Sequence, residues 1–236
     1  SAHYNLANAL RDLNRLNKAI DAYDKALKLT PAHVGALINR GQLYERLQKY
    51  DKALESYDRA LAANPENANV HYNKANVLRE LGRLEDALSA YTQAIALAPG
   101  NVGALNNRGN LLMRLRRNRE ALRDYDAALA VAPDNSGTHC NRGNVLFELR
   151  QFDQASAAYE RAAALSPGLP EAHRGLGNTF FELGQYEQAF QAYDAAYRAD
   201  PDRDYIEGCR LHTKMHVCDW DNLAAETASL LAHHFL

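Results

Sequence analysis

Apolar residues recur along the chain at the spacing of amphipathic helices, in pairs of helical segments separated by a short break. In residues 68–101, Val70 and Leu78 fall on one helical face, and a second apolar series begins at Leu84, just after Gly82. Each such segment has one apolar stripe that must pack against another helix. The pattern therefore predicts an all-α chain built from helix-turn-helix pairs.

The helix pairs are copies of one unit of 34 residues. Prolines mark the period at Pro31, Pro65, Pro99, Pro133, Pro167 and Pro201. Four other series keep it: Ala19, Ala53, Ala87, Ala121, Ala155 and Ala189; Tyr23, Tyr57, Tyr91, Tyr125, Tyr159 and Tyr193; Ala26, Ala60, Ala94, Ala128, Ala162 and Ala196; and Ala7, Gly41, Ala75, Gly109, Gly143 and Gly177. The period predicts six units, residues 1–33, 34–67, 68–101, 102–135, 136–169 and 170–203, followed by a degenerate helix pair over residues 204–236.

Residue types within the unit suggest how it is held together. The small residues let neighbouring backbones approach, and the tyrosine ring fills the remaining gap. We expect the tyrosine hydroxyl to stay in contact with water. Proline ends the second helix, and Gly82 and Gly184 suit a left-handed cap at the end of the first. The acids Asp51, Glu85, Asp153 and Glu187 fall in the first turn of the second helix, where its dipole favours them.

A period of 34 residues with these alanines, tyrosines and prolines resembles the tetratricopeptide repeat. The resemblance implies a right-handed superhelical solenoid, in which first helices line the concave side and second helices the convex side. It also implies a protein-protein interaction module. The expected partners are proteins or peptides in extended conformation, and a homodimer through the convex face stays open.

Two rows of amide side chains follow the first helices. The first amide row is Asn5, Asn39, Asn73, Asn107 and Asn141, and the second amide row is Asn8, Gln42, Asn76, Asn110, Asn144 and Asn178. A primary amide offers donors and an acceptor, so one asparagine can bond both the C=O and the N–H of a peptide backbone. Asparagine is a poor interior helix former, which favours a role for these positions. The rows predict a peptide-binding site; alternatively, they bond the neighbouring repeat or are only solvated.

A row of cations lies next to the first amide row, at Arg40, Lys74, Arg108 and Arg142. Acids recur in the second helices at Asp24, Asp58, Asp126, Glu160 and Asp194, so we expect ion pairs between helices rather than a phosphate site. The carboxylate clamp of chaperone-binding repeats wants a lysine just before the amide position, and Tyr4, Ile38, Tyr72, Asn106 and Cys140 stand there. The arginines around Asn118 are interpreted as a solvated face.

Composition sets further bounds. A net charge of −2 argues against general binding to nucleic acid or anionic membranes, and no apolar run is long enough to span a bilayer. The three cysteines, Cys140, Cys209 and Cys218, form no secreted disulfide framework, which favours the cytoplasm. Cys209, His212 and His216 share a helical face, but without a Cys-x-x-Cys pair we expect packing and no metal.

The asparagine row, together with Cys218, Asp219 and Trp220, resembles the N-terminal half of O-GlcNAc transferase-like glycosyltransferases. In that family the asparagines contact the backbone of protein substrates, and a second, catalytic half uses UDP-GlcNAc. This chain has no phosphate loop and no paired nucleophile, so we expect it to bind without catalysis or cofactor. We interpret it as a fragment that continues past Leu236; the alternative is a stand-alone scaffold with no linked enzyme.

Overall fold

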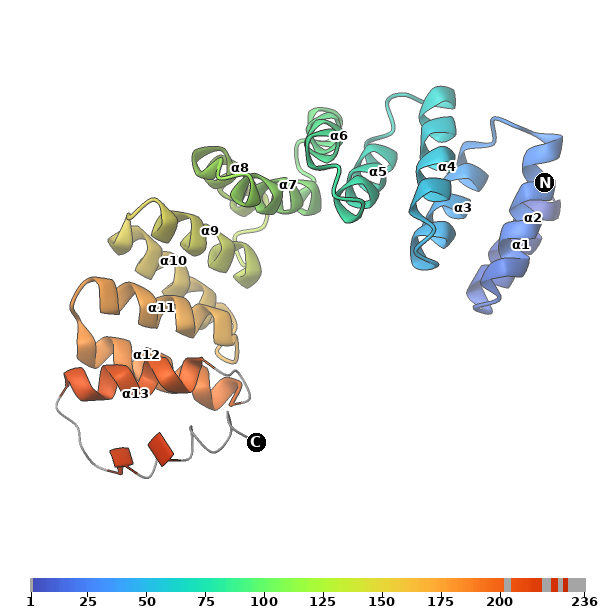
Figure 1. Ribbon diagram of the computed structural model, residues 1–236. Coiled ribbons are helices and arrows are strands. Elements are labelled where there is room, and N and C mark those ends of the chain that lie inside the picture. The colour runs from blue at the N-terminus through green and yellow to red at the C-terminus, as the bar shows by residue number, and fades with distance from the viewer. Residues whose placement is uncertain (1, 202–204, 218–221, 225–226, 229–236) are drawn as a thin grey trace. The chain divides into compact units, whose positions relative to one another are not determined.

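The computed structural model describes residues 2–201, 205–217, 222–224 and 227–228 (Figure 1). The chain divides into two compact units, residues 1–111 and 112–236. Thirteen helices form in the described part of the chain, and no strand occurs among these residues. The prediction of an all-α chain is confirmed.

The helices follow one another in pairs joined by short turns. In the first unit they are α1 Ala2–Asp12, α2 Leu16–Leu29, α3 Val34–Arg46, α4 Tyr50–Ala63, α5 Ala68–Glu80 and α6 Leu84–Leu97, and α7 Val102–Arg114 spans the boundary. In the second unit they are α8 Asn118–Val131, α9 Ser136–Glu148, α10 Phe152–Leu165, α11 Pro170–Glu182, α12 Tyr186–Ala199 and α13 Ile206–His216.

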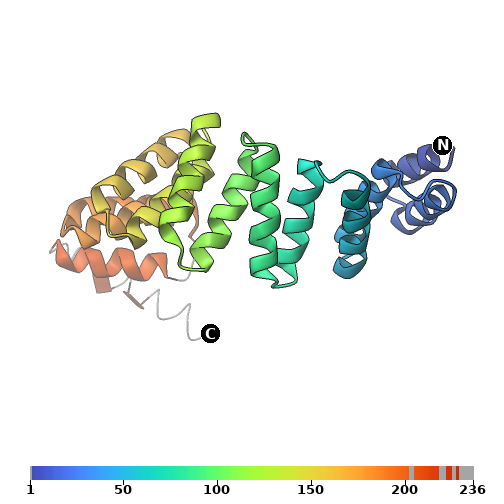
Figure 2. The same cartoon turned by 90° about the horizontal axis from the view of Figure 1, so that it is seen from above.

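Each helix packs against its pair partner and against a helix of the next pair. In the first unit α1 contacts α2, α3 contacts α4 and α5 contacts α6, while α2 meets α3 and α4 meets α5. In the second unit each helix from α8 to α13 contacts the next, and Figures 1 and 2 show α9 to α13 side by side. The predicted stack of helix-turn-helix repeats is therefore present in both units.

Alanines and tyrosines form the interior, as predicted. The alanine series at the close helix contacts is fully buried. Tyr23, Tyr57, Tyr91 and Tyr125 are 0% exposed. A Cβ added to Gly41 would lie 2.5 Å from Cε1 of Tyr57, so the ring occupies the space that glycine leaves. Replacing such a glycine would overpack the core.

Proline and the left-handed turn residues set the helix ends. α2 ends two residues before Pro31, and Thr30 is extended at φ −138°, because a residue before proline avoids the helical conformation. Gly82 and Gly184 have φ of +73° and +71°, which confirms the predicted caps. The same turn elsewhere holds residues with side chains, namely Asn14, Gln48, Arg116 and Arg150.

Side chains before the first helices supply the opposite caps. The Asn67, Asn101 and Asn135 side chains accept hydrogen bonds from the backbone N–H of Val70, Ala104 and Thr138. These caps satisfy donors that a helix start leaves unpaired. They fix where the helices that carry the amide rows begin.

Candidate functional site

The first amide row lies on the first helices of five successive pairs, α1, α3, α5, α7 and α9. Asn5 is exposed, and Asn39, Asn73, Asn107 and Asn141 are half-buried. Gly175 and Cys209 take the corresponding positions on α11 and α13. A Cβ at Gly175 would lie 2.3 Å from Cε1 of the Tyr159 ring, which explains why the row stops there.

The second amide row accepts hydrogen bonds from buried tyrosines. The hydroxyls of Tyr23, Tyr91, Tyr159 and Tyr193 donate to the Oδ1 atoms of Asn8, Asn76, Asn144 and Asn178 at 2.6, 2.6, 2.8 and 2.8 Å. The expectation of water-exposed hydroxyls is therefore wrong. The rings are so deeply buried that each hydroxyl needs a protein acceptor. Burial raises the pKa of Tyr91 to about 12, which keeps its phenol protonated as a donor.

Two first-row amides bond the preceding repeat. The Asn107 Nδ2 donates to Asn76 Oδ1 at 3.0 Å and to the Tyr72 hydroxyl at 3.2 Å. Asn39 Nδ2 repeats this one repeat pair earlier. It lies 3.1 Å from Asn8 Oδ1 and 3.5 Å from the Tyr4 hydroxyl. At these positions the amides bond the neighbouring repeat, as the alternative interpretation of the rows anticipated.

Other first-row amides make no such bond. The side chains of Asn5 and Asn73 have no hydrogen-bond partner among the described residues of the first unit. The side chain of Asn141 likewise has none among the described residues of the second unit. The first amide row thus contains amides that bond the protein itself and amides that are available to a ligand.

The repeat pair, 68 residues long, explains this difference. Tyr4 and Tyr72 stand just before Asn5 and Asn73, whereas Ile38 and Asn106 occupy that place in the alternate repeats. The two tyrosines provide hydroxyls that Ile38 cannot, so Asn39 and Asn107 find an acceptor on the preceding repeat. Sequence analysis placed the amides but missed these tyrosines. The matching triplets His3-Tyr4-Asn5 and His71-Tyr72-Asn73 were the signal that could have revealed them.

Where the second row lacks asparagine, the tyrosine finds another acceptor. Gln42 is exposed in the second repeat, and the Tyr57 hydroxyl donates to Glu45 Oε2 at 3.0 Å. Burial raises the pKa of Glu45, although the hydrogen bond from Tyr57 lowers it in part. Glu45 thereby takes the acceptor role that Asn8 has in the first repeat.

The cations beside the first amide row pair with acids of the preceding second helix, as expected. Arg40, Lys74 and Arg142 lie 2.7, 2.6 and 2.7 Å from Asp24, Asp58 and Asp126. Arg108 donates to the Thr92 hydroxyl at 3.1 Å instead, because threonine replaces the acid in that repeat. Engaged in this way, the cations serve interhelix packing.

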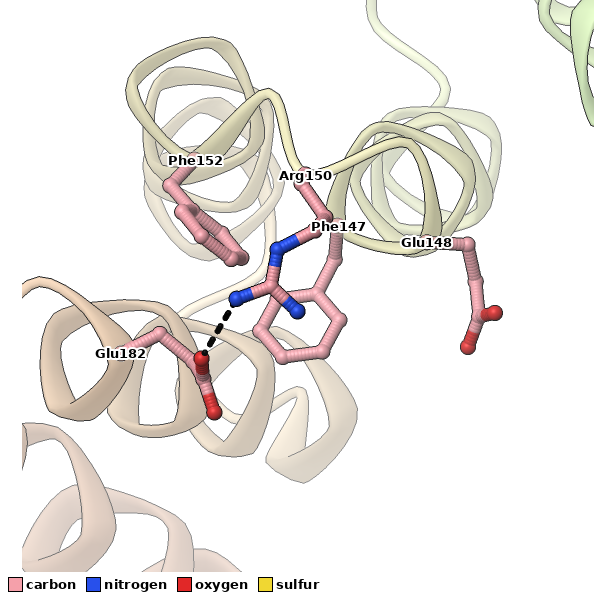
Figure 3. A pocket seen from close by; sticks show the side chains of 5 residues that line it. All are labelled: Phe147, Glu148, Arg150, Phe152 and Glu182. Carbon is pink, nitrogen blue, oxygen red and sulfur yellow. Dashed lines mark hydrogen bonds and ion pairs between the residues drawn. The ribbon is translucent and has the colours of Figure 1, made fainter.

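A cavity of about 260 Å³ opens at the turn between α9 and α10 and is lined by Phe147, Glu148, Arg150, Phe152 and Glu182 (Figure 3). The Arg150 guanidinium lies 5.1 Å from the centre of the Phe152 ring and 3.4 Å from the Glu182 carboxylate. Glu148 pairs with Arg116 at 3.1 Å. These charges satisfy one another, which favours a structural role for this cavity over a binding role.

The metal-ligand residue types near the C-terminus pack as aromatic groups. His216 stacks on Tyr186 at 4.5 Å, and His212 lies 5.5 Å from Phe181. No group of three His, Cys, Asp or Glu side chains in the described part of the chain could hold a metal ion. Burial raises the pKa of the Cys140 thiol to about 11. Cys218, Asp219 and Trp220 lie outside the described residues.

The helix pairs define a helical repeat protein, and comparisons with known proteins specify the class. A family model described as tetratricopeptide repeat matches residues 38–102 and 140–204, which is more than half of the chain. Models described as TPR repeat and tetratricopeptide repeat match residues 7–48 and 102–135. The chain belongs to the tetratricopeptide repeat family, whose repeats form a non-catalytic protein-interaction fold.

Solved structures share this fold at low sequence identity. YrrB, described as a TPR protein with an unusual peptide-binding site, gives a TM-score of 0.72 at 22% identity, covering 83% of this chain and 99% of its own. A tetratricopeptide repeat protein from Parabacteroides merdae gives 0.73 at 20% identity, covering 98% and 91%. PilW, a type IV pilus biogenesis factor, gives 0.71 at 24% identity, covering 84% and 92%. A search of curated proteins found no match. Among the helices that the structure describes, none has the length and apolar character of a membrane span.

Proposed function

We propose that the two amide rows bind extended segments of partner proteins through the peptide backbone. The observation that carries this proposal is the half-buried Asn73 amide on α5, which has no hydrogen-bond partner among the described residues of its unit. Its neighbour Asn76, one helical turn away, is fixed by Tyr91. Asn73 thus offers a donor and an acceptor on a rigid helix, which matches the C=O and N–H that every peptide unit presents.

Binding of this kind depends little on the ligand's side chains. The first amide row has no titratable group, and the adjacent cations Arg40, Lys74 and Arg142 are engaged in ion pairs. Each net hydrogen bond contributes only about 0.5–1.5 kcal/mol, so affinity would come from several amides acting together. Partners would therefore share an extended backbone more than a common sequence.

The Asn73→Ala variant tests the proposal. Peptides of unrelated sequence would first be selected on the wild-type chain from a random library of extended segments. We expect the variant to weaken all of them alike, by roughly 3- to 10-fold in Kd, since one or two backbone bonds are lost. Fluorescence anisotropy measures this, with Asn17→Ala on the exposed face of α2 as the control. Unequal losses would contradict backbone recognition, and unchanged affinities would overturn the site.

A narrower proposal concerns the parent protein. The asparagine row and the sequence Cys218-Asp219-Trp220 support a substrate-recruiting region of an O-GlcNAc transferase-like protein. The rival proposal is a stand-alone scaffold for complex assembly, in keeping with the general interaction role of the repeat family. Only the first proposal requires a catalytic domain linked to these repeats, so the size of the native polypeptide discriminates between the two.

A further inference from the structure

The bonds around Asn76 and Asn107 use opposite ends of the two amides. Asn76 Oδ1 accepts from the Tyr91 hydroxyl at 2.6 Å and from Asn107 Nδ2 at 3.0 Å, which occupies both of its lone pairs. Asn107 Nδ2 gives its second proton to the Tyr72 hydroxyl at 3.2 Å. The groups left for a ligand are the pair of Asn76 N–H groups and the Asn107 oxygen.

The same arrangement occurs in the preceding repeat pair, which makes it a property of the architecture. Asn8 Oδ1 accepts from Tyr23 at 2.6 Å and from Asn39 Nδ2 at 3.1 Å. The rings of Tyr4 and Tyr23 lie 6.0 Å apart at 53°, and those of Tyr72 and Tyr91 lie 6.2 Å apart at 54°. Two copies with matching geometry indicate a defined hydrogen-bond relay.

Glycine makes room for the relay. A Cβ on Gly103 would lie 3.2 Å from the Tyr72 hydroxyl, and one on Gly35 would lie 3.1 Å from the Tyr4 hydroxyl. Both distances are tighter than ordinary contacts, so a larger residue would displace the hydroxyl that accepts from the amide. The sequence thus keeps space for a bond that orients Asn107 and Asn39.

We propose that this relay fixes the polarity of the amides, so that Asn76 contacts only backbone C=O groups of a bound strand and Asn107 contacts only backbone N–H groups. Asn73 stays free to contact either. This inference rests on the proposed peptide-binding function and assigns each amide its role in it. The repeat pair, rather than the single repeat, is then the unit that reads the strand, with Asn8 and Asn39 acting as the equivalent pair.

Two opposed substitutions test the polarity. Asn76→Asp keeps an oxygen that accepts from Tyr91 and Asn107, so we expect the melting temperature to stay within about 2 °C of wild type. Asn107→Asp removes both donors and places a carboxylate against Asn76 Oδ1, so its melting temperature should fall by several degrees. Asn73→Asp adds the same charge outside the relay and serves as the control. Equal stability losses in the first two variants, or a larger loss in Asn76→Asp, would overturn the assigned polarity.

Peptide affinity tests the roles in binding. With library-selected peptides, Asn76→Asp should weaken binding by about 10-fold or more, because its two donors become an acceptor that faces a carbonyl. Methylating the ligand backbone nitrogens one at a time should abolish the contact at the N–H that faces Asn107. Unchanged affinity in Asn76→Asp would refute the donor role while leaving the Asn73 result intact. If wild type selects no peptide, the proposed function fails, and the stability comparison still decides the polarity.

Discussion

At the residue scale, the buried tyrosine decides which amides are available. Its ring fills the space between helices, and its hydroxyl must then find an acceptor inside the protein. Asparagine supplies that acceptor in four repeats, and Glu45 supplies it to Tyr57. The same side chain that completes the core thereby orients part of the candidate binding surface.

The acceptor Glu45 has a consequence for pH dependence. Its pKa is raised in the folded state, so the folded protein holds the proton more tightly than the unfolded chain, and stability falls as the pH rises through the raised value. Glu45→Gln keeps an oxygen for Tyr57 without the buried charge. We expect a higher melting temperature than wild type at pH 7, and a gap that closes below the ordinary carboxyl pKa of about 4.3. Thermal unfolding at both pH values measures this.

Glu66→Gln is the matched control, because it removes the same charge from an exposed position. An equal gain in both variants would point to overall charge as the cause. A gap that persists at low pH would contradict the role given to Glu45 protonation.

At the element scale, the turn between paired helices shows where local structure and sequence disagree. Gly82 and Gly184 adopt the left-handed conformation freely, whereas Gln48, Arg116 and Arg150 adopt it with a side chain. Arg116 and Arg150 reach acids 32 residues further on, Glu148 and Glu182. Helix packing holds these turns in shape even where the residue does not favour it.

Gln48 offers a direct test of this strain. It is exposed and has φ +56°, and its side chain makes no hydrogen bond with the described residues. Gln48→Gly should stabilise the protein by about 0.5–1 kcal/mol, since left-handed strain exceeds the added freedom of the unfolded chain. Urea unfolding would measure the gain. The reverse change, Gly82→Gln, should cost a similar amount, and a stability loss in Gln48→Gly would contradict the argument.

At the scale of the whole molecule, the repeat is regular in its core and irregular in its amides. Every unit keeps the alanines, tyrosine and proline, and each stack within residues 1–111 and 112–236 follows from them. The amides instead differ between alternate repeats, in step with Tyr4 and Tyr72. Binding would therefore follow a longer period than folding does.

The mass of the native polypeptide separates the two proposed parent proteins. An antibody raised against this chain should detect a band far above 26.3 kDa if the repeats recruit substrates for a linked transferase. UDP-GlcNAc binding by that larger protein would then be the next measurement. A band at 26.3 kDa would sink the transferase proposal and leave the scaffold.

The sequence by itself determined the helix pairs, their 34-residue period, the family and the positions of both amide rows. It could do so because small residues, tyrosine and proline act locally, through close packing and backbone conformation, and each repeat restates the same signal. Tertiary structure alone decided the state of each amide. Whether Asn73 is free and Asn107 is bonded depends on hydroxyls more than 30 residues away, which packing brings within about 3 Å. Hydrogen-bond direction is a property of that three-dimensional neighbourhood, and single-residue identity does not contain it.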